Sequence, residues 1–501
     1  MNLDLKLIEH ANRIPEQLAL GWESESLSYK ELNNQVQMLA NQFYLQGIEL
    51  GDRIGIILEN SPEFVISYYA CMRAGAISVP VNAALTAREI GVIINDSKPK
   101  IIITDKRRNS ILDEVQFDFN PKIIVTDVGD EWLDKSILED TASINLSKNT
   151  EECTLLYTSG TTGLPKGAIL THENLYHNAK VFGEALDISS NEKTLIVTPL
   201  SHISAQSNCL NTTLVSGGYN YLMKRWKSTK KIIDIMEKKG ITYFFGPPTT
   251  YTYILNYASI NKFDLNLRVA YTGGASLPEN VFINWRDTFG FEIVEGYGLT
   301  EAAPVVCVNP LYGEKKLGSV GLPLRDVNVK IVKNEFEEVN VGEVGELVVQ
   351  GPNVMKGYFN LTKENKEVFH DGWLRTGDIA KKDEDGYLYI VDRKKSMIIR
   401  SGFNVYPREV EEVLFTHPAV LEVAVIGVPH HEKGELVKAF VTLKQNENRE
   451  DMSDELIEYC KNRLATYKVP SEIDFVSELP KTSTGKIFKR KLQELAKGNS
   501  L

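Results

Sequence analysis

Short apolar runs alternate with stretches of helical periodicity in the N-terminal part of the chain, and this alternation restricts the fold classes open to it. Residues 53–58, 76–81 and 101–104 have the pattern of buried strands. Helices are predicted near them, because Ser28 begins an S-x-x-E capping-box pattern and 63–73 has helical spacing. The order strand, helix, strand is typical of a parallel sheet with flanking helices, so the sequence predicts an α/β fold.

The strand pattern recurs further along the chain, and each of these later runs ends in a loop rich in glycine or proline. The predicted strands with their turns cover 193–199, 241–248, 267–272 and 291–296, with helical segments from near 203 and at 234–239. Ligands of parallel α/β sheets bind at the carboxyl ends of the strands. We therefore expect the loops after these strands to converge on one crevice.

The pattern changes after Gly318 to short strands separated by Gly, Asp and Asn turns. Strands predicted at 327–332, 345–350 and 387–391 indicate a small antiparallel or β-barrel-like unit. A second change follows the charged stretch 392–395, so we expect an N-terminal domain over 1–392 and a small α+β C-terminal domain over 393–501. The elements of the latter are predicted at 398–405, 407–416, 423–428, 437–443 and 453–464.

The length, apolar runs, cysteines and net charge of the chain limit the class of protein to which it can belong. A length of 501 residues exceeds what one hydrophobic core usually serves. Since no apolar run approaches membrane-spanning length and acidic residues lie near the N-terminus, we expect a cytoplasmic protein. The five scattered cysteines predict buried thiols rather than disulfides or zinc ligands, and the formal net charge of -11 opposes non-specific binding of nucleic acid.

Residues 157–172 combine glycines, Ser and Thr hydroxyls and Lys166 between two apolar runs. Glycine lets backbone N–H groups approach an anion, while hydroxyls and lysine add donors and positive charge, so the run is typical of a phosphate-binding loop. It differs from a Walker P-loop, because Gly167 follows the lysine where Mg²⁺ coordination requires Ser or Thr. A solvated turn is the alternative interpretation.

Further motifs follow this loop in a fixed order: 297–301, 376–378, 392–395 with 401–404, and 480–486. In their order and spacing the motifs resemble those of the adenylate-forming acyl-CoA synthetases, and the resemblance extends from about Ser28 to Lys486. It implies an AMP-forming acid–thiol ligase. Such an enzyme joins a carboxylate to the α-phosphorus of ATP, releases pyrophosphate and passes the acyl group from AMP to the thiol of coenzyme A.

The resemblance also implies a role for each nucleotide-binding motif. The β- and γ-phosphates would be held by Thr158, Ser159, Gly160, Thr161, Thr162, Gly163 and Lys166. Thr300 would donate a hydrogen bond to the α-phosphate, and Glu301 would bind Mg²⁺, which prefers oxygen ligands. Tyr297, followed by Gly298, would present its aromatic face to adenine.

The other side of the adenine would be lined by Gly274 and Ala275, and Asp378 with Arg393 would contact the ribose. Taken alone, each of these is an ordinary loop residue, and only the register with the other motifs favours a functional role.

Lys486 is expected to act in the first half-reaction, by stabilising charge around the α-phosphate and aligning the carboxylate. A solvated lysine is the alternative, as for its C-terminal neighbours. Lys395 occupies the position at which the C-terminal lid of the family pivots, after which Ser401 and Gly402 would approach the pantetheine tunnel. For 393–395 the alternative is a solvated charge run.

His202 would contact the substrate carboxylate or gate the thiol. Candidates for the CoA phosphates are Arg400, Arg408 and Lys438.

Two sequence features suggest which carboxylic acid is the substrate, and they favour different acids. The amino-acid sequence of 401–407 resembles that of bacterial long-chain synthetases, which favours a fatty acid as substrate. The polar residues Ser204, Gln206, Ser207 and Asn208 resemble instead the carnitine and crotonobetaine CoA ligases, which favours a shorter or polar acid. Solvent exposure of that helix face is the simpler interpretation of these residues. We place a fatty acid ahead of a polar one.

Two rival functions stay open. One is transfer of the acyl group to the phosphopantetheine of an acyl-carrier protein, and the other is a nucleotide-binding protein without catalysis. Retention of Lys166, Glu301, Asp378 and Lys486 opposes the second rival, because each chemical role still has its residue.

Overall fold

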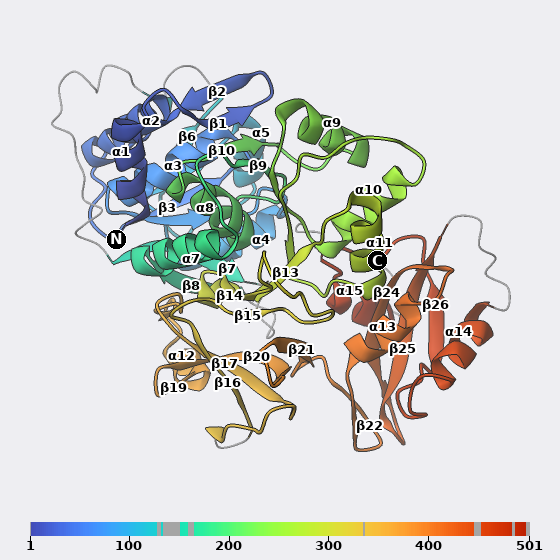
Figure 1. The fold of residues 1–501 in the computed structure, drawn as a ribbon. Coiled ribbons are helices and arrows are strands. Elements are labelled where there is room, and N and C mark those ends of the chain that lie inside the picture. Colours follow the sequence, from blue (N-terminus) through green and yellow to red (C-terminus); the bar gives the residue numbers. More distant parts are fainter. Residues whose placement is uncertain are drawn as a thin grey trace.

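The computed structural model describes residues 2–127, 132–133, 151–158, 165–333, 336–444, 452–482 and 486–496 of the chain. In this part of the chain the strands form two large sheets, a smaller antiparallel sheet and the sheet of a C-terminal unit. Figure 1 shows the C-terminal unit, in red, beside α10 (Pro248–Ala258) and α11 (Glu279–Phe289). The α/β prediction is confirmed.

The first sheet contains the parallel strands predicted from the N-terminal pattern. Its order is β18 (Gly357–Tyr358), β8 (Lys166–Thr171), β7 (Glu152–Thr158), β4 (Ile77–Pro80), β3 (Arg53–Ile57), β5 (Ile101–Thr104) and β6 (Lys122–Val125). The nearby helices are α2 (Tyr29–Leu45), α3 (Pro62–Arg73), α4 (Ala87–Ser97) and α5 (Lys106–Leu112). Ser28 caps α2 as predicted, because its hydroxyl accepts from the Glu31 N–H and the Glu31 carboxylate accepts from the Ser28 N–H.

The segment expected to bind phosphate connects two antiparallel strands of this sheet. β7 ends at Thr158 and β8 begins at Lys166, and these two residues are partners in the antiparallel register. The lysine is therefore a strand residue at the base of the connection. Ser159, Gly160, Thr161, Thr162 and Gly163 lie outside the described residues.

The second sheet carries the later strands of the alternating pattern. Its order is β15 (Leu322–Pro323), β14 (Val305–Val308), β13 (Val294–Gly298), β12 (Val269–Gly273), β11 (Tyr243–Phe245), β9 (Lys193–Ile196), β10 (Tyr219–Leu222), β1 (Leu18–Trp22) and β2 (Glu25–Ser28). The strands from β13 through β9 to β1 pair in parallel, so β11, β12 and β13 end at the same edge. β13 continues through Tyr297 and Gly298, two residues past its predicted end at 296.

The helices that belong to this part are α1 (Leu3–Arg13), α7 (His172–Ala185), α8 (Thr212–Val215) and α9 (Thr229–Lys239), together with α10 and α11. A π-helix, η3 (Ser204–Asn211), follows β9 where the sequence predicts a helix.

An antiparallel sheet follows, as predicted. It pairs β16 (Asn328–Val332), β17 (Gly345–Gln350), β20 (Trp373–Lys382) and β19 (Phe369–His370) in that order, with β21 (Leu388–Arg393) also on β20 and α12 (Thr362–Val368) before β19. β21 includes Arg393, whose backbone pairs with Asp378. Arg393 thus continues the sheet of the N-terminal part.

The C-terminal unit has an α+β arrangement. Its elements are β22 (Ile398–Arg400), β23 (Phe403–Val405), α13 (Pro407–Phe415), β24 (Val420–His430), β25 (Gly434–Leu443), α14 (Met452–Lys461), β26 (Glu472–Phe475) and α15 (Lys489–Ala496). The single strand predicted over 398–405 is a hairpin instead. The chain reverses where Ser401 and Gly402 both have positive φ, at 51° and 81°.

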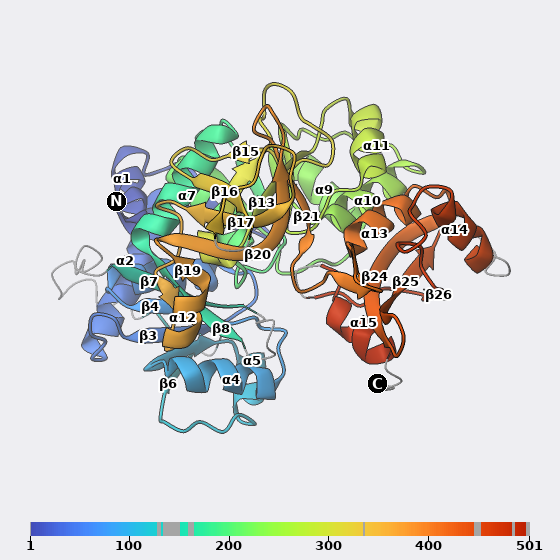
Figure 2. The ribbon, with the colours of Figure 1, turned by 90° about the horizontal axis from the view of Figure 1, so that it is seen from below.

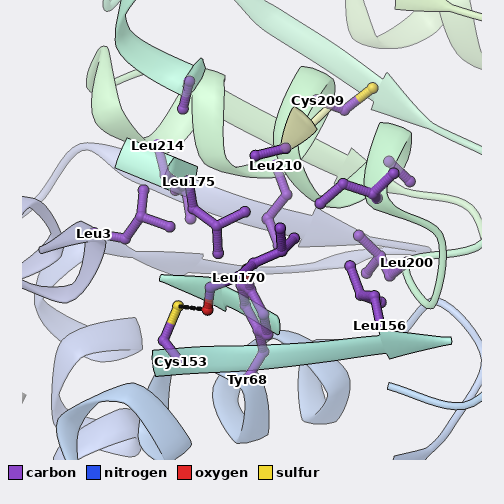
Figure 3. Close-up of a cluster of buried hydrophobic side chains, with 14 of the residues drawn as sticks. Leu3, Tyr68, Cys153, Leu156, Leu170, Leu175, Leu200, Cys209, Leu210 and Leu214 are labelled. Atoms are coloured by element: carbon purple, nitrogen blue, oxygen red, sulfur yellow. Dashed lines mark hydrogen bonds between the residues drawn. The ribbon is translucent and has the colours of Figure 1, made fainter. Parts of the chain in front are cut away.

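One hydrophobic core joins the two large sheets. In Figure 3, Leu156 and Leu170 from β7 and β8 face Leu200, Leu210 and Leu214, which follow β9. Seen from below in Figure 2, the C-terminal unit lies apart from this core, and a separate cluster fills its own interior. The cysteines are buried free thiols, as predicted, and no helix among the described residues is long and apolar enough to cross a membrane.

Candidate functional site

Segments distant in the sequence meet at the carboxyl ends of β12 and β13. Lys486, from the C-terminal unit, reaches Gly274 so closely that a Cβ built on the glycine would lie 2.6 Å from the lysine Cε. Asp378 and Arg393 lie near enough to Lys486 to influence its charge, and Lys486 in turn influences His202. The structure therefore brings together residues from five of the predicted site segments.

Asp378 is held by two side chains. The Tyr297 hydroxyl donates to its Oδ2 atom, and the Arg393 Nε donates to its Oδ1 atom at 3.2 Å. Burial raises the pKa of Asp378, which is 3% exposed, while Arg393 and the Tyr297 hydroxyl act in the opposite direction. Because each carboxylate oxygen accepts more than one hydrogen bond, Asp378 keeps acceptor capacity for a diol.

The turn after β13 places Thr300 and Glu301. Glycine is required at 298, because a Cβ there would lie 2.1 Å from the Pro304 carbonyl oxygen. The short helix η4 (Thr300–Ala302) then begins, and the Tyr358 hydroxyl donates to Oε1 of Glu301 at 2.8 Å. The Lys166 Nζ lies 5.2 Å from the centre of the Tyr358 ring. Tyr358 thus connects Glu301 with the phosphate-loop lysine.

The sequence analysis did not identify Tyr358 as a site residue. Its only local signal is a Gly-Tyr pair, which forms the two-residue strand β18 beside β8. Its link to Glu301 depends on pairing between strands distant in the sequence.

Lys486 is half-buried, with Asp378 and Arg393 as its charged neighbours. Burial, followed by repulsion from Arg393, lowers its pKa to about 8, while Asp378 acts in the opposite direction. Its backbone is fixed by a hydrogen bond from the Thr482 N–H to the Lys486 carbonyl at 2.7 Å. A solvated lysine, the alternative considered for this residue, does not describe this environment.

His202 is a neutral hydrogen-bonding group. Its Nδ1 atom accepts from the Ser204 N–H at 3.2 Å and lies 2.7 Å from the Ser204 hydroxyl, so the remaining proton of the neutral ring is on Nε2. Burial and the nearby Lys486 lower the pKa of His202 to about 3. The imidazole can donate a hydrogen bond from Nε2 but carries no charge near neutral pH.

The polar residues after His202 are buried, and the expectation that they form a solvated helix face is wrong. Ser204, Gln206, Ser207 and Asn208 are 9%, 0%, 0% and 4% exposed. The Ser207 hydroxyl donates to the Ala303 carbonyl at 2.9 Å, and the Gln206 amide donates to the Leu200 carbonyl at 2.7 Å. These segments surround η3, so its polar face is buried against protein.

Two amide oxygens of η3, those of Gln206 and Asn208, have no hydrogen-bond partner within the part of the chain that the structure describes. A buried acceptor without a partner costs free energy. They are therefore candidates to accept a hydrogen bond from a bound molecule or water.

The segment expected to pivot connects β21 to β22. Lys395 lies in the turn between these strands. The start of α13 is held against β21, because the Arg408 N–H donates to the Asp392 carboxylate at 3.0 Å. Lys394 pairs with Glu346 at 3.2 Å, although its side chain is 53% exposed. Ser401 and Gly402 are exposed on the β22–β23 hairpin, as are Gly274 and Ala275 at the end of β12.

The cations considered for the CoA phosphates already have partners. Arg400 donates to the carbonyls of Tyr467 and Val469, Arg408 to the Ile390 carbonyl, and Lys438 pairs with Glu472 and Asp474. A feature that the sequence analysis missed lies beside them. The exposed ring of Phe403 stacks on Tyr467, with centroids 4.7 Å apart.

Family models and similar proteins identify the family to which this chain is related. The model of the AMP-binding enzyme family matches residues 7–359, and that of the AMP-binding enzyme C-terminal domain matches 409–486. The long-chain-fatty-acid–CoA ligase of Bacillus subtilis is 36% identical, over 97% of this chain and 93% of its own. A feruloyl-CoA synthase of Amycolatopsis is also 36% identical, over 96% of each chain.

A similar solved structure is that of the ATP-bound RpMatB-BxBclM chimera B1, with a TM-score of 0.91, 31% identity and 99% of each chain covered. The family models, the similar sequences and the similar fold together cover nearly the whole chain. The chain therefore belongs to the AMP-binding family of adenylate-forming enzymes and is an AMP-forming acid–CoA ligase of the acyl-CoA synthetase type.

Proposed function

We propose that this ligase works in two half-reactions that use different placements of its C-terminal unit. In the first, a carboxylate attacks the α-phosphorus of ATP, forming acyl-AMP and releasing pyrophosphate. In the second, the CoA thiol attacks the acyl carbonyl and AMP leaves. The observation that carries the proposal is the placement of Lys486 of the C-terminal unit, which lies against Gly274 and beside Asp378 and Arg393.

The nucleotide would be oriented by β13 and β20. Asp378 is positioned by Tyr297 and Arg393 to accept from both ribose hydroxyls, and the fixed Tyr297 ring offers a face to adenine. Lys166 and Thr158, at the base of the β7–β8 connection, would contact the β- and γ-phosphates, together with the loop between them.

The residues around Glu301 suit Mg²⁺. The described residues contain no cluster of three or more acidic, His or Cys side chains that would hold a metal alone. Mg²⁺ is usually bound by one or two carboxylates together with substrate phosphates and water. Glu301, oriented by Tyr358, would supply the carboxylate, and the ion would neutralise phosphate charge.

Lys486 would stabilise the first transition state. Negative charge gathers on the α-phosphate oxygens as the carboxylate attacks, and an ammonium group already positioned there stabilises that charge strongly. His202, neutral and with its proton on Nε2, would hold the carboxylate by a hydrogen bond.

The thiol acceptor would be coenzyme A. The exposed ring of Phe403, on the hairpin that follows the pivot segment, stacks on Tyr467, which lies in the turn between α14 and β26. Lys468 lies beside Tyr467 and pairs with Glu409 at 2.6 Å. An exposed aromatic surface suits the adenine of coenzyme A, and an acyl-carrier protein has no such nucleotide. Carrier-protein phosphopantetheine is the alternative acceptor.

Two classes of carboxylic acid are candidates for the substrate. The similarity to long-chain-fatty-acid–CoA ligases supports a fatty acid. The buried polar face of η3, with the amide oxygens of Gln206 and Asn208, supports a compact acid that carries a hydrogen-bond donor. An alkyl chain against these oxygens would leave them without partners, which is unfavourable.

Pyrophosphate release with a panel of acids tests the proposal. The panel contains octanoate, palmitate, ferulate, 3-hydroxybutyrate and a betaine acid, each with CoA and with a holo acyl-carrier protein. We expect AMP and pyrophosphate from one acid class and a thioester with CoA. Release of ADP, or no pyrophosphate with any acid, would contradict the adenylation chemistry. Thioester with the carrier protein alone would contradict the CoA assignment.

A substitution distinguishes the two acid classes. If a compact polar acid is the substrate, Asn208→Leu should lower kcat/KM for it and raise the relative use of octanoate. If a fatty acid is the substrate, the wild type already prefers octanoate or palmitate, and the polar acids give no pyrophosphate.

A further inference from the structure

A partly buried lysine connects the C-terminal unit to the N-terminal part near the site. The Lys481 Nζ donates to the Tyr253 hydroxyl at 2.6 Å and pairs with Glu422 at 2.8 Å. Tyr253 belongs to α10 of the N-terminal part, whereas Glu422 belongs to β24 of the C-terminal unit. The side chains of Lys481 and Glu422 are 15% and 8% exposed. One lysine therefore has a partner in each part of the protein.

The same lysine lies on the segment that supports Lys486. Residue 481 forms an antiparallel bridge with Ile487, and the Phe488 N–H donates to the Pro480 carbonyl at 2.7 Å. The Thr482 N–H donates to the Lys486 carbonyl at 2.7 Å. These backbone bonds tie the strand of Lys481 to the strand of Lys486. A displacement of Lys481 is thus transmitted to the ammonium group in the site.

We propose that Tyr253, Lys481 and Glu422 form a clasp that holds the C-terminal unit in the arrangement of the first half-reaction, with Lys481 as the positioning residue for Lys486. The proposal rests on the proposed function, because it assigns the clasp to one of its two arrangements. A rotation of the C-terminal unit about 394–397 that carries Lys481 away from α10 breaks its contact with Tyr253, since the two residues belong to different parts.

The charges explain how such a clasp opens. The ion pair of Lys481 with Glu422 lies within the C-terminal unit and travels with it. Only the hydrogen bond to the neutral Tyr253 hydroxyl is exchanged for one to water. Breaking a buried ion pair would leave an unpaired charge at high cost, whereas loss of this bond does not. The contact is therefore specific to one arrangement without preventing the other.

The tyrosine is also held in place from its own side. Trp226 packs against the Tyr253 ring with centroids 6.3 Å apart, and the Lys481 Nζ lies 5.1 Å from the ring centre. Replacement of Tyr253 by Phe keeps the ring and removes only the hydroxyl. Tyr257, one turn further along α10, packs on Phe263 and provides a matched control for the same chemical change.

The test measures each half-reaction separately in the full-length enzyme. Tyr253→Phe should lower acid-dependent ATP–pyrophosphate exchange about tenfold at saturating ATP, with KM for ATP unchanged because the nucleotide contacts remain. Thioester formation from supplied acyl-adenylate and CoA should be unchanged or faster. Tyr257→Phe should leave both rates within about twofold. Equal losses in both half-reactions, or exchange rates equal to those of Tyr257→Phe, would overturn the proposal.

A measurement without substrates separates this inference from the proposed function. Trypsin cleavage after Lys394 or Lys395 reports how often the segment between the two parts becomes accessible. We expect several-fold faster cleavage in Tyr253→Phe than in the wild type or Tyr257→Phe. Equal cleavage rates in all three proteins would overturn the clasp, even if ligase activity is demonstrated. Absence of pyrophosphate release by the wild type, with faster cleavage in Tyr253→Phe, would contradict only the assigned reaction.

Discussion

Gly274 and Lys486 meet at a distance that leaves no room for a side chain on the glycine. A Cβ built at 274 would lie 2.6 Å from the lysine Cε and 2.8 Å from its Nζ. The glycine also has a φ of 80°, a conformation that other residues adopt at a cost. The end of β12 is therefore shaped to receive the lysine of the C-terminal unit, which gives the glycine a role in positioning the two parts.

Gly274→Ala should impair the first half-reaction, because the methyl group displaces Lys486 from the carboxylate and phosphate. A misplacement of about 1 Å at a reacting centre lowers rates on the order of a hundredfold. The measurement is acid-dependent ATP–pyrophosphate exchange. Gly290→Ala is the control, since Gly290 has a φ of 79° but nothing within 4 Å of its built Cβ. An equal loss of exchange in both variants would assign the effect to backbone strain, and wild-type rates in Gly274→Ala would contradict the role of the glycine.

Lys486→Ala should remove most adenylation and leave thioester formation from supplied acyl-adenylate largely intact. The ammonium group is placed to stabilise charge that develops only in the first transition state, and loss of such a group typically costs about 100- to 1,000-fold. Lys491→Ala, a change of the same kind on α15, should leave both half-reactions unaffected. Equal loss of both steps in Lys486→Ala would contradict the proposed division of labour.

Much of the fold could be predicted from local patterns. The run at 101–104 became β5 with the same bounds, because an uninterrupted apolar stretch suits a strand covered on both faces. Ser28 and Glu31 fixed the start of α2 through bonds between neighbours in the chain. Such patterns involve only residues that are neighbours in the chain, so they predict the same local structure whatever the rest of the fold.

The features that could not be predicted depend on contacts between distant segments. The burial of Gln206 and Ser207 is set by Leu200 and Ala303, so polar residues that suggest a solvated face lie inside the protein. Tyr358 reaches Glu301 only because β18 pairs with β8. The family resemblance assigned Lys486 a function, but its close approach to Gly274 follows from how the C-terminal unit is placed.

The pH dependence of adenylation should report the ionisation of Lys486. Burial and Arg393 lower its pKa from 10.5 to about 8, so the ammonium form predominates below pH 8 and is lost above it. We expect kcat/KM for pyrophosphate release to decline above about pH 8, approaching about tenfold per pH unit. In Lys486→Arg, whose guanidinium stays charged, any remaining activity should lack this decline. A decline that persists in the arginine variant would assign it to another group.

Stability of the N-terminal part should depend on a buried ion pair. Arg73 donates to Asp4 at 2.7 Å, and both side chains are fully buried. Asp4→Ala leaves the guanidinium without its counter-ion, which should lower the free energy of unfolding by about 3–5 kcal/mol. Glu9→Ala removes the exposed partner of Lys6 and should cost less than about 1 kcal/mol. Urea unfolding followed by circular dichroism measures both, and equal midpoints would contradict the role of the Asp4–Arg73 pair.

Lys395→Pro should affect the two half-reactions in the opposite sense to Lys486→Ala. Residue 395 lies in the turn between β21 and β22, and proline fixes φ there and restricts the residue before it. Because the first arrangement already places Lys486 in the site, adenylation should persist, while a rotation that needs new backbone angles at 395 should slow. Thioester formation from supplied acyl-adenylate should therefore fall at least severalfold. Lys395→Ala removes the same side chain without stiffening the backbone, so the effect of proline is measured relative to this variant. If thioester formation is as fast in the proline variant as in the alanine variant, the C-terminal unit does not pivot at this residue.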